Sequence, residues 1–228
     1  MARIGIITGI PIEAACVDLR QKAEHEIIIR SGVGYENAKK NAHYLINQKI
    51  DGLVSFGVAG GLSPSIESGM LVVPSEIRGR DQVIAVSGSW RQSLLSRFNE
   101  MVSFSAGPMA HADRVLTEAV DKQEMFWDTR TSACDMESFG VGEVAAIFDI
   151  PFLIVRAVSD PVDLSIPSWV PGLLDHQGCV KKLDFCCQLL AHPMDIVGLW
   201  HIARASNKAF KCLKTVSRLA GPGFGFPI

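Results

Sequence analysis

The sequence predicts an α/β fold, in which a central sheet is covered by helices on both faces. Short apolar runs rich in β-branched residues alternate along the chain with longer helix-like stretches. Most of these runs are continuously apolar rather than alternating, which is typical of strands buried on both faces. A composition of 48% hydrophobic and 20% charged residues, with 20 glycines, suits a globular protein of this kind.

Strands and helices are predicted in alternation as far as residue 158. The predicted strands are Ile4–Thr8, His25–Arg30, Gly52–Gly57, Met70–Pro74, Val83–Val86 and Phe152–Val158. The predicted helices are Pro11–Lys22, Tyr35–Gln48, Ser89–Val102, Thr117–Thr129 and Glu137–Phe148. Glycine turns precede the first two helices and Pro151 follows the last, which supports these boundaries.

After the segment SDPVDLSIPSWVPG the pattern predicts helices alone. One helix is expected over Leu173–Ala191 and a second over roughly Met194–Ala220. We interpret residues 1–228 as one domain, with an all-helical basic extension over about 194–220. The tail GPGFGFPI is rich in Gly and Pro and has two exposed-looking Phe residues, so we expect it to cover a groove or to be disordered.

The second of these helices has an uneven charge pattern. No Asp or Glu follows Asp195, whereas cations recur at steps of 4, 3, 3 and 4, at Arg204, Lys208, Lys211, Lys214 and Arg218. This spacing places all five on one helical face. The face is either a plain solvated surface or a basic amphipathic helix that contacts an anionic membrane or its headgroups.

Composition excludes several classes of protein. The formal charge of −2 gives no overall attraction for nucleic acid, and the six cysteines show no C-x-x-C spacing, so neither a zinc site nor a disulfide framework is expected. The start MARIGIITG lacks the apolar core of a signal peptide, and no run of eighteen apolar residues occurs. We therefore expect a cytoplasmic protein with reduced cysteines, and leave open peripheral contact with the inner membrane face.

Four predicted turns at the ends of strands carry residues with chemical potential, and in α/β sheets ligands bind at such ends. The segment TGIPIEA places Glu13 in the first turn of a helix, where a carboxylate also serves as a plain cap. The segment SFGVAGGLSP (Ser55–Pro64) is rich in glycine, so its bare N–H groups could hold an anion or a hydroxyl. It matches neither G-x-G-x-x-G nor the Walker pattern.

The other two turns are CDMES, which contains Glu137, and RAVSDP, which contains Asp160. Asp160 ends a buried strand before a proline, so turn formation is the simpler explanation for it. The two acids are 23 residues apart, in a helix and the strand that follows it. A right-handed connection can bring both to the same edge of the sheet.

Taken in order, these segments resemble the nucleoside phosphorylase and nucleosidase superfamily, in particular its methylthioadenosine/S-adenosylhomocysteine nucleosidase branch. The resemblance runs from Arg3 to about Pro161 and is carried by IGIITGIPIEA, SGVGYENA, GVAGGLSPSIESGMLVVPSEI, ACDMESFGVGEVA and PFLIVRAVSD. It implies a three-layer α-β-α sandwich with a central, mixed, largely parallel twisted sheet. It also implies an enzyme, an N-ribosyl hydrolase or a nucleoside phosphorylase, that needs no cofactor or metal.

The resemblance implies roles for individual residues. Asp160 would donate a proton to the purine N7, oriented by Ser159, and Glu137 would accept hydrogen bonds from the ribose hydroxyls. Glu13 would position the attacking water. The remaining substrate-binding residues implied are Met136, packed against the sugar, the backbone segment Val58, Ala59 and Gly60, and Val115 and Leu116 in the base loop HADRVL. Asp135 matches the motif without an assigned contact, which favours a structural role.

The choice of nucleophile stays open between water and phosphate. Phosphorylases of the superfamily hold phosphate with arginines at two places where this chain has Glu13 and Ser55. A glutamate would repel phosphate, which favours water. The other candidates for a phosphate site are Arg30, Arg78 and Arg114.

The segments ADRVLTEAVDKQEM and ACDMES, with the helical C-terminus, resemble the hopanoid-associated phosphorylase subgroup. That resemblance implies release of adenine from adenosylhopane, a lipid-linked purine nucleoside, beside a membrane. Two other enzymes are alternatives: a methylthioadenosine/S-adenosylhomocysteine nucleosidase and a phosphate-dependent purine nucleoside phosphorylase. Two other classes of protein are also considered: a nucleoside-binding regulator without turnover and a membrane-associated module. The family also implies a homo-oligomer.

Overall fold

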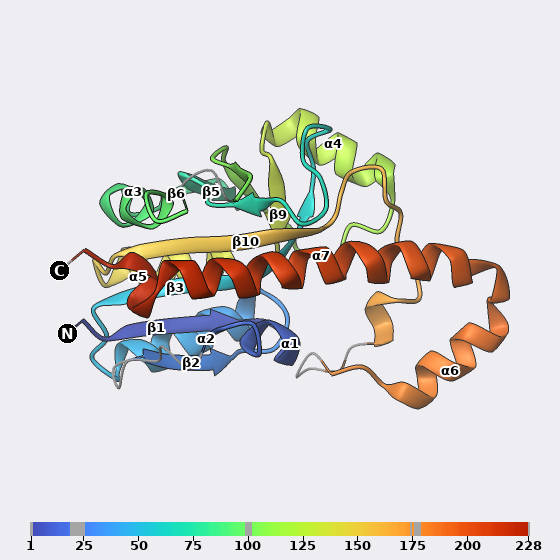
Figure 1. Ribbon diagram of the computed structural model, residues 1–228, viewed down its shortest axis with the longest axis horizontal. Helices are drawn as coiled ribbons and strands as arrows, with labels where there is room; N and C mark the ends of the chain where they lie inside the picture. The colour runs from blue at the N-terminus through green and yellow to red at the C-terminus, as the bar shows by residue number, and fades with distance from the viewer. Residues whose placement is uncertain (1, 19–25, 99–101, 174, 176–178, 228) are drawn as a thin grey trace.

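The computed structural model describes residues 2–18, 26–98, 102–173, 175 and 179–227. Its centre is formed by β1 (Ile4–Thr8), β2 (Glu26–Arg30), β3 (Gly52–Gly61) and β10 (Phe152–Asp160) (Figure 1). These strands pair in parallel in the order β2, β1, β3, β10. Their carboxyl ends therefore meet at one edge of the sheet.

A second group of short strands extends the sheet beyond β3. The end of β3 pairs in antiparallel fashion with β9 (Ala133–Asp135), and β8 (Met109–His111), β5 (Glu76–Gly79) and β6 (Gln82–Ala85) follow in that order. On the far side of β10 lie β4 (Leu71–Val72) and β7 (Phe104–Ser105). The sheet is mixed and largely parallel, as predicted.

Helices cover both faces of this sheet. In Figure 1, α7 (Ile196–Ala220) crosses in front of β10, on which it packs. Behind the strands, α2 (Tyr35–Ile46) packs on α5 (Ser138–Ile147). The remaining helices are α1 (Pro11–Ala14), α3 (Gly88–Leu95), α4 (Ala119–Thr129) and α6 (Lys182–Ala191), with 3-10 turns η3 (Pro171–Leu173), η4 (Pro193–Asp195) and η5 (Pro222–Gly225). The predicted three-layer α-β-α sandwich is confirmed.

Several predicted boundaries were wrong. Helix α1 stops at Ala14 rather than Lys22, since the chain continues from there as a turn, and the predicted part over 19–22 lies outside the described residues. The first residue of the predicted strand at His25, and the predicted helical residues 99–101, 174 and 176–178, also lie outside them. Helix α3 ends at Leu95, and α6 begins at Lys182 rather than Leu173.

The strand predictions erred mainly by omission. Both central strands run further than expected, β3 to Gly61 and β10 to Asp160, whereas the run Met70–Pro74 keeps only the short β4. Strands β5, β7, β8 and β9 were not predicted. Each has only two to four residues, which is too short for a period of two to be recognised.

The C-terminal tail is part of the core. The Phe224 side chain is buried and packs on Phe56 with ring centroids 5.4 Å apart. Trp90 Nε1 donates to the Phe224 carbonyl (3.0 Å), and Phe226 meets the Trp90 ring edge-on at 4.7 Å. The two Phe side chains inferred to be exposed are in fact buried (Phe224) and partly buried (Phe226), and both pack against the core.

Five cysteines are free thiols, namely Cys16, Cys134, Cys179, Cys187 and Cys212. The side chain of Cys186 lies outside the described part of the chain. Within the described residues, no helix is both long enough and apolar enough to cross a membrane.

Candidate functional site

A cavity of ≈ 230 Å³ lies at the edge where the central strands end. Its walls come from the turn after β1, the end of β3, the turn between β9 and α5, and the end of β10. All ten predicted site residues line it: Glu13, Val58, Ala59, Gly60, Val115, Leu116, Met136, Glu137, Ser159 and Asp160. The topology thus brings together residues that are up to about 150 positions apart in sequence.

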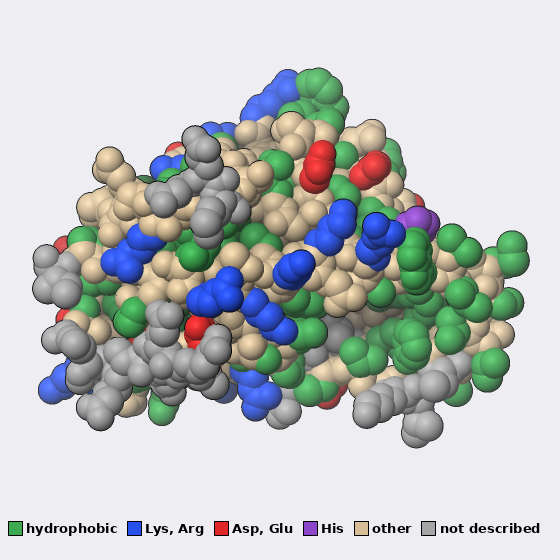
Figure 2. Space-filling view, viewed as in Figure 1, with side chains coloured by type: hydrophobic (Ala, Val, Ile, Leu, Met, Phe, Trp, Pro, Cys, Tyr) green, Lys and Arg blue, Asp and Glu red, His purple; other side chains and the backbone are tan. Residues whose placement is uncertain are grey.

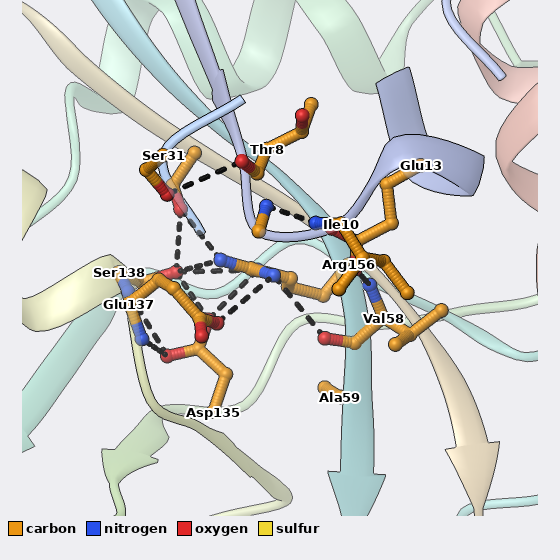
Figure 3. A network of polar contacts seen from close by, with 12 residues as sticks. Thr8, Ile10, Glu13, Ser31, Val58, Ala59, Asp135, Glu137, Ser138 and Arg156 are labelled. Atoms are coloured by element: carbon orange, nitrogen blue, oxygen red, sulfur yellow. Dashed lines mark hydrogen bonds and ion pairs between the residues drawn. The ribbon is translucent and has the colours of Figure 1, made fainter. Parts of the chain in front are cut away.

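The guanidinium of Arg156 is a fully buried charge beside this cavity (Figure 3). Arg156 comes from the middle of β10, and its Nε lies 2.7 Å from Asp135 Oδ2. Its Nη1 is 3.7 Å from Glu137 Oε2 and donates to the Val58 carbonyl (3.2 Å). Its Nη2 donates to Ser55 Oγ (2.7 Å). Arg156 therefore joins β3, β9 and the start of α5 into one polar network.

Glu13 enters the same network from α1. Its Oε2 accepts hydrogen bonds from the backbone N–H groups of Gly9 (2.8 Å) and Ile10 (2.9 Å), and its Oε1 accepts one from Val58 (2.8 Å). Burial raises the pKa of Glu13, while Arg156 and these N–H groups oppose that rise. Of these three N–H groups, that of Val58 belongs to the glycine-rich segment predicted to hold an anion, and it holds the carboxylate of Glu13 from the end of β3 rather than from a turn.

Close contact between these groups requires a glycine in β3. A Cβ atom built on Gly57 would lie 2.3 Å from Glu13 Oε1 and 2.5 Å from Arg156 Nη1. Both neighbours are held by hydrogen bonds, so neither could move aside cheaply. The glycine at this position therefore serves a close side-chain approach.

Asp135 and Ser138 tie the turn before α5 to Arg156. The carboxylate of Asp135 accepts hydrogen bonds from the backbone N–H groups of Ser138 (3.0 Å) and Glu137 (3.3 Å) and from the Ser138 hydroxyl. Ser138 Oγ also lies 2.9 Å from Ser55 Oγ, so a hydrogen bond joins the two hydroxyl groups. Every oxygen of Asp135 is thus used within the protein, which agrees with the structural role expected for it.

Glu137 keeps more of its hydrogen-bonding capacity for a ligand. Its Oε1 accepts one hydrogen bond, from the backbone N–H of Gly34 (2.8 Å), and its Oε2 faces Arg156. Burial raises the pKa of Glu137 to about 7, Arg156 opposes the rise, and the nearby Asp135 and Glu13 add to it. This carboxyl group therefore titrates close to neutral pH.

Asp160 stands apart from that network, at the end of β10. Its Oδ1 accepts a hydrogen bond from Ser159 Oγ (2.5 Å), and its Oδ2 lies 2.8 Å from Lys122 Nζ. Burial raises the pKa of Asp160, while Lys122 and Ser159 act against that rise. The result is a carboxyl group that can hold a proton at higher pH than an exposed aspartate.

Lys122 is itself buried and belongs to α4. Besides the ion pair with Asp160, its Nζ donates to the backbone carbonyls of Asp160 (3.3 Å), Pro161 (3.1 Å) and Leu164 (2.9 Å). These contacts hold the turn after β10 against α4. Lys122 therefore positions Asp160 in two ways: its charge attracts the Asp160 carboxylate, and its hydrogen bond holds the Asp160 backbone.

The rest of the wall is mainly apolar. Met136, Val115, Leu116 and the nearby Ile166 present side chains without charges, as a binding site for a flat, partly apolar ligand requires.

Of the three arginines considered for a phosphate site, only Arg114 lines this cavity, and its Nη2 is already paired with Asp121 (2.9 Å). Arg78 is paired with Glu76 (2.7 Å), and Arg30 is exposed at the end of β2.

Two residues of the site, Arg156 and Lys122, were missed at the level of sequence. Arg156 carried a usable signal, because a single charge inside the apolar run FLIVRAV must be paired if that run is buried. Lys122 carried none, because α4 contains several polar residues and the partner of Lys122 is 38 residues away.

Replacing Arg156 by Met should lower the free energy of unfolding by about 3–5 kcal/mol near pH 8, since it leaves buried carboxylates unpaired. The pKa of Glu137 is about 7 in the folded protein, above its ordinary value of 4.5 in the unfolded chain. A group of this kind stabilises the fold fully below pH 4.5, and this stabilisation is lost as the pH rises through about 7. Without Arg156 this pKa rises further, so the deficit should be smaller at pH 5 than at pH 8.

Urea unfolding at both pH values measures this difference, and Arg78→Met, which removes a half-exposed ion pair with Glu76, is the matched control. A deficit for Arg156→Met that is the same at both pH values would contradict the electrostatic account of Arg156.

Comparison with known proteins gives a consistent result. A 5′-methylthioadenosine/S-adenosylhomocysteine nucleosidase of Shewanella pealeana is 25% identical over 170 residues, which are 64% of this chain and 74% of the relative. The homologous enzyme of Shewanella sediminis is 24% identical over 163 residues, 62% of this chain and 70% of the relative.

Solved structures show the same fold at lower identity. The 5′-methylthioadenosine/S-adenosylhomocysteine nucleosidase of Neisseria meningitidis superposes with a TM-score of 0.72 at 18% identity, covering 96% of this chain and 99% of that one. The futalosine hydrolase of Helicobacter pylori superposes with a TM-score of 0.69 at 16% identity, covering 94% and 97%.

The family model of the phosphorylase superfamily matches residues 15–177, which is more than half of the chain. The match includes every predicted site residue except Glu13. The prediction of an enzyme of the nucleosidase or nucleoside phosphorylase type is confirmed at this level. This chain belongs to the phosphorylase superfamily.

Proposed function

We propose that the protein cleaves the N-glycosidic bond of a 5′-substituted adenosine and releases adenine. The observation that carries this proposal is the position of two carboxyl groups with raised pKa values, the partly buried Asp160 and the buried Glu137, on the wall of one largely apolar cavity. Methylthioadenosine/S-adenosylhomocysteine nucleosidases among the relatives and a futalosine hydrolase among the similar structures support this class of reaction.

Departure of adenine requires that its developing negative charge be neutralised. A protonated Asp160 supplies a proton to the purine N7 and is regenerated by water after the product leaves. Its raised pKa keeps the proton available, while Ser159 and Lys122 orient the two carboxyl oxygens. Donation by a positioned acid of this kind contributes about 10²–10⁴-fold to the rate.

The ribosyl group becomes positively charged as the bond breaks. The free lone pairs of Glu137 are available for the 2′- and 3′-hydroxyls of the ribose, and its negative charge stabilises the cationic centre. Met136 provides a polarisable apolar surface for the sugar in the same wall. Val58, Ala59 and Gly60 offer their backbone edge to the nucleoside.

Water is proposed as the nucleophile. Glu13, Asp135 and Glu137 surround the single guanidinium of Arg156, so this end of the site carries an excess of negative charge that repels phosphate. The backbone N–H groups of Gly9, Ile10 and Val58, which could hold an anion, are occupied by Glu13. The alternative, phosphorolysis, would have to use Arg114 at the cavity wall.

The apolar part of the cavity wall bears on the identity of the 5′-substituent. The wall residues Val115, Leu116 and Ile166 favour an apolar group, such as a methylthio group or a longer hydrocarbon. The resemblance to the hopanoid-associated subgroup favours adenosylhopane as the substrate. The alternative is the activity of a methylthioadenosine/S-adenosylhomocysteine nucleosidase. We also propose that the protein forms a homo-oligomer.

The acid assignment predicts that Asp160→Asn lowers kcat for adenine release from methylthioadenosine by about 10²–10⁴-fold, because the amide cannot donate an acidic proton. Asp163→Asn, an exposed change three residues further on, should leave the rate unchanged. A spectrophotometric assay of released adenine measures both. Full activity in Asp160→Asn would rule out this residue as the proton donor.

The ion pair with Lys122 predicts a shift in pH dependence. Lys122→Met removes the charge that opposes the rise in the pKa of Asp160, so Asp160 should stay protonated to higher pH. The alkaline limb of kcat/KM should therefore move to higher pH, with Lys40→Met as the surface control. A purely structural role for Lys122 would lower activity at every pH and leave that limb in place.

The water assignment predicts that adenine release proceeds in phosphate-free buffer and yields the free sugar. Glu13→Gln should reduce kcat by about 10²-fold or more, because the amide is a poor hydrogen-bond acceptor for the attacking water. Product analysis by mass spectrometry, with and without phosphate, measures this. Release that depends on phosphate and yields a sugar 1-phosphate would instead support a phosphorylase, and Arg114→Gln would then be expected to abolish it.

A further inference from the structure

The long helix α7 has two different faces. Its buried face packs on the sheet through Ala209, Leu213 and Val216. Its opposite face presents a basic stripe that consists of Arg204, Lys208, Lys211, Lys214 and Arg218, all of them exposed. In Figure 2 this stripe runs along the molecular surface as a row of Lys and Arg side chains. The helix contains no Asp or Glu that would balance it.

The stripe is not neutralised by its surroundings. Among the described ion pairs, none joins a cation of the stripe to a carboxylate. Acids occur only singly in the hollows beside it: Glu67, Asp163 and Asp18. The basic stripe thus presents five positive charges along one side of the molecule against three scattered acids.

At one end the stripe meets an exposed apolar tip, at the corner between α6 and α7. The side chains of this tip remain largely in water, with exposed fractions of 85% for Leu190, 89% for Met194, 53% for Ile196, 65% for Val197 and 56% for Trp200. Figure 2 shows hydrophobic side chains gathered at this end of the molecule, on the face that carries the stripe. Arg204 lies over the Trp200 ring at 5.5 Å, so the two regions are continuous.

We propose that the basic stripe and the apolar tip together form a docking surface for an anionic lipid bilayer. Aliphatic side chains and a tryptophan at one end would insert at the boundary between headgroups and acyl chains. The cations along α7 would lie over anionic headgroups, which attract Lys and Arg residues near the membrane surface. Both regions are needed for this mode of binding, and both lie on one face.

Charge favours a bilayer over other occupants. In a symmetric contact, a second copy of this chain would bring one stripe against another, and the acids that flank the stripe are too few and too dispersed to offset that repulsion. A nucleic acid would use the cations but leave the aliphatic tip without a partner. A bilayer accepts both parts at once.

The surface also lies close to the cavity. The turn after β10 lines the cavity with Asp160 and Ile166, and lines the hollow beside Arg204 with Pro161 and Leu164. One short segment thus separates the proposed docking surface from the site. The proposal does not depend on the reaction catalysed there, because it rests only on α7 and the apolar tip.

Vesicle co-sedimentation of the full chain tests the proposal. Vesicles of phosphatidylcholine alone are compared with an equimolar mixture of phosphatidylcholine and phosphatidylglycerol. The protein should bind the anionic vesicles and not the neutral ones. A triple variant of the stripe, Lys208→Gln, Lys211→Gln and Lys214→Gln, should weaken binding by about 100-fold, since each cation near an anionic surface contributes about fivefold.

A second triple variant, Met194→Ser, Val197→Ser and Trp200→Ser, removes much of the tip at constant charge. It should also weaken binding, and the loss should be largest at high salt, where the apolar contribution dominates. Trp200 fluorescence should shift to the blue on binding in the native protein.

Matched controls remove the same chemistry elsewhere. Three exposed cations are changed by Arg30→Gln, Lys40→Gln and Lys49→Gln, and three exposed apolar side chains by Val120→Ser, Trp127→Ser and Ile147→Ser. Both controls should bind as the native protein does, and thermal unfolding shows that every variant is folded.

Three results would overturn the proposal. The first is absence of binding to anionic vesicles by the native protein. The second is equal loss of binding in the stripe variant and its control, which would indicate overall charge alone. The third is a tip variant that changes the sedimentation coefficient of the free protein and leaves vesicle binding intact, which would identify the tip as a self-association face.

Discussion

The buried guanidinium of Arg156 is the interaction on which the rest of the site depends. Glu13, Asp135 and Glu137 approach it from three separate elements of the chain. Each of these ions loses water on folding, at a cost of several kcal/mol, and only a shared counter-charge with further hydrogen bonds offsets that loss. The compensation is incomplete for Glu137, whose pKa rises to about 7. The arrangement therefore leaves Glu137 as a carboxyl group that titrates near neutral pH.

The second constraint is the glycine-rich segment at the end of β3, which has a different role in the structure from the one predicted. A turn with free backbone N–H groups suggests a site for an external anion. Here the N–H of Val58 already holds Glu13, and Gly57 leaves room for this contact because any Cβ would collide with Glu13 and Arg156. The anion that the segment binds is internal. The Val58 N–H is therefore not free for phosphate, and the charge of the Glu13 carboxylate opposes phosphate binding.

How much of the structure could be predicted from the sequence depends on how many residues form each hydrophobic pattern. The central strands and helix α5 have long apolar patterns, and they placed Glu137 and Asp160 at one edge correctly. Strand β9 and the other short strands have too few residues to show a period. Phe224 looked exposed because Gly and Pro around it indicate a turn, whereas its burial depends on Phe56, 168 positions earlier. Long-range pairs such as Lys122 with Asp160 leave no local trace.

The two buried cations divide the cavity into ends of different charge. Around Arg156 three carboxylates face one guanidinium, a net charge of −2 when all are ionised. At the other end Lys122 and Asp160 form a single pair, which is neutral when Asp160 is ionised and positive when it carries the proton. Breaking the bond between ribose and adenine creates positive charge on the sugar and negative charge on the base. In the proposed binding mode, a negative end beside the sugar and a protonated end beside the base both lower the energy of that charge separation. Because both cations are fixed in the core, the protein does not have to reorganise as the charges develop.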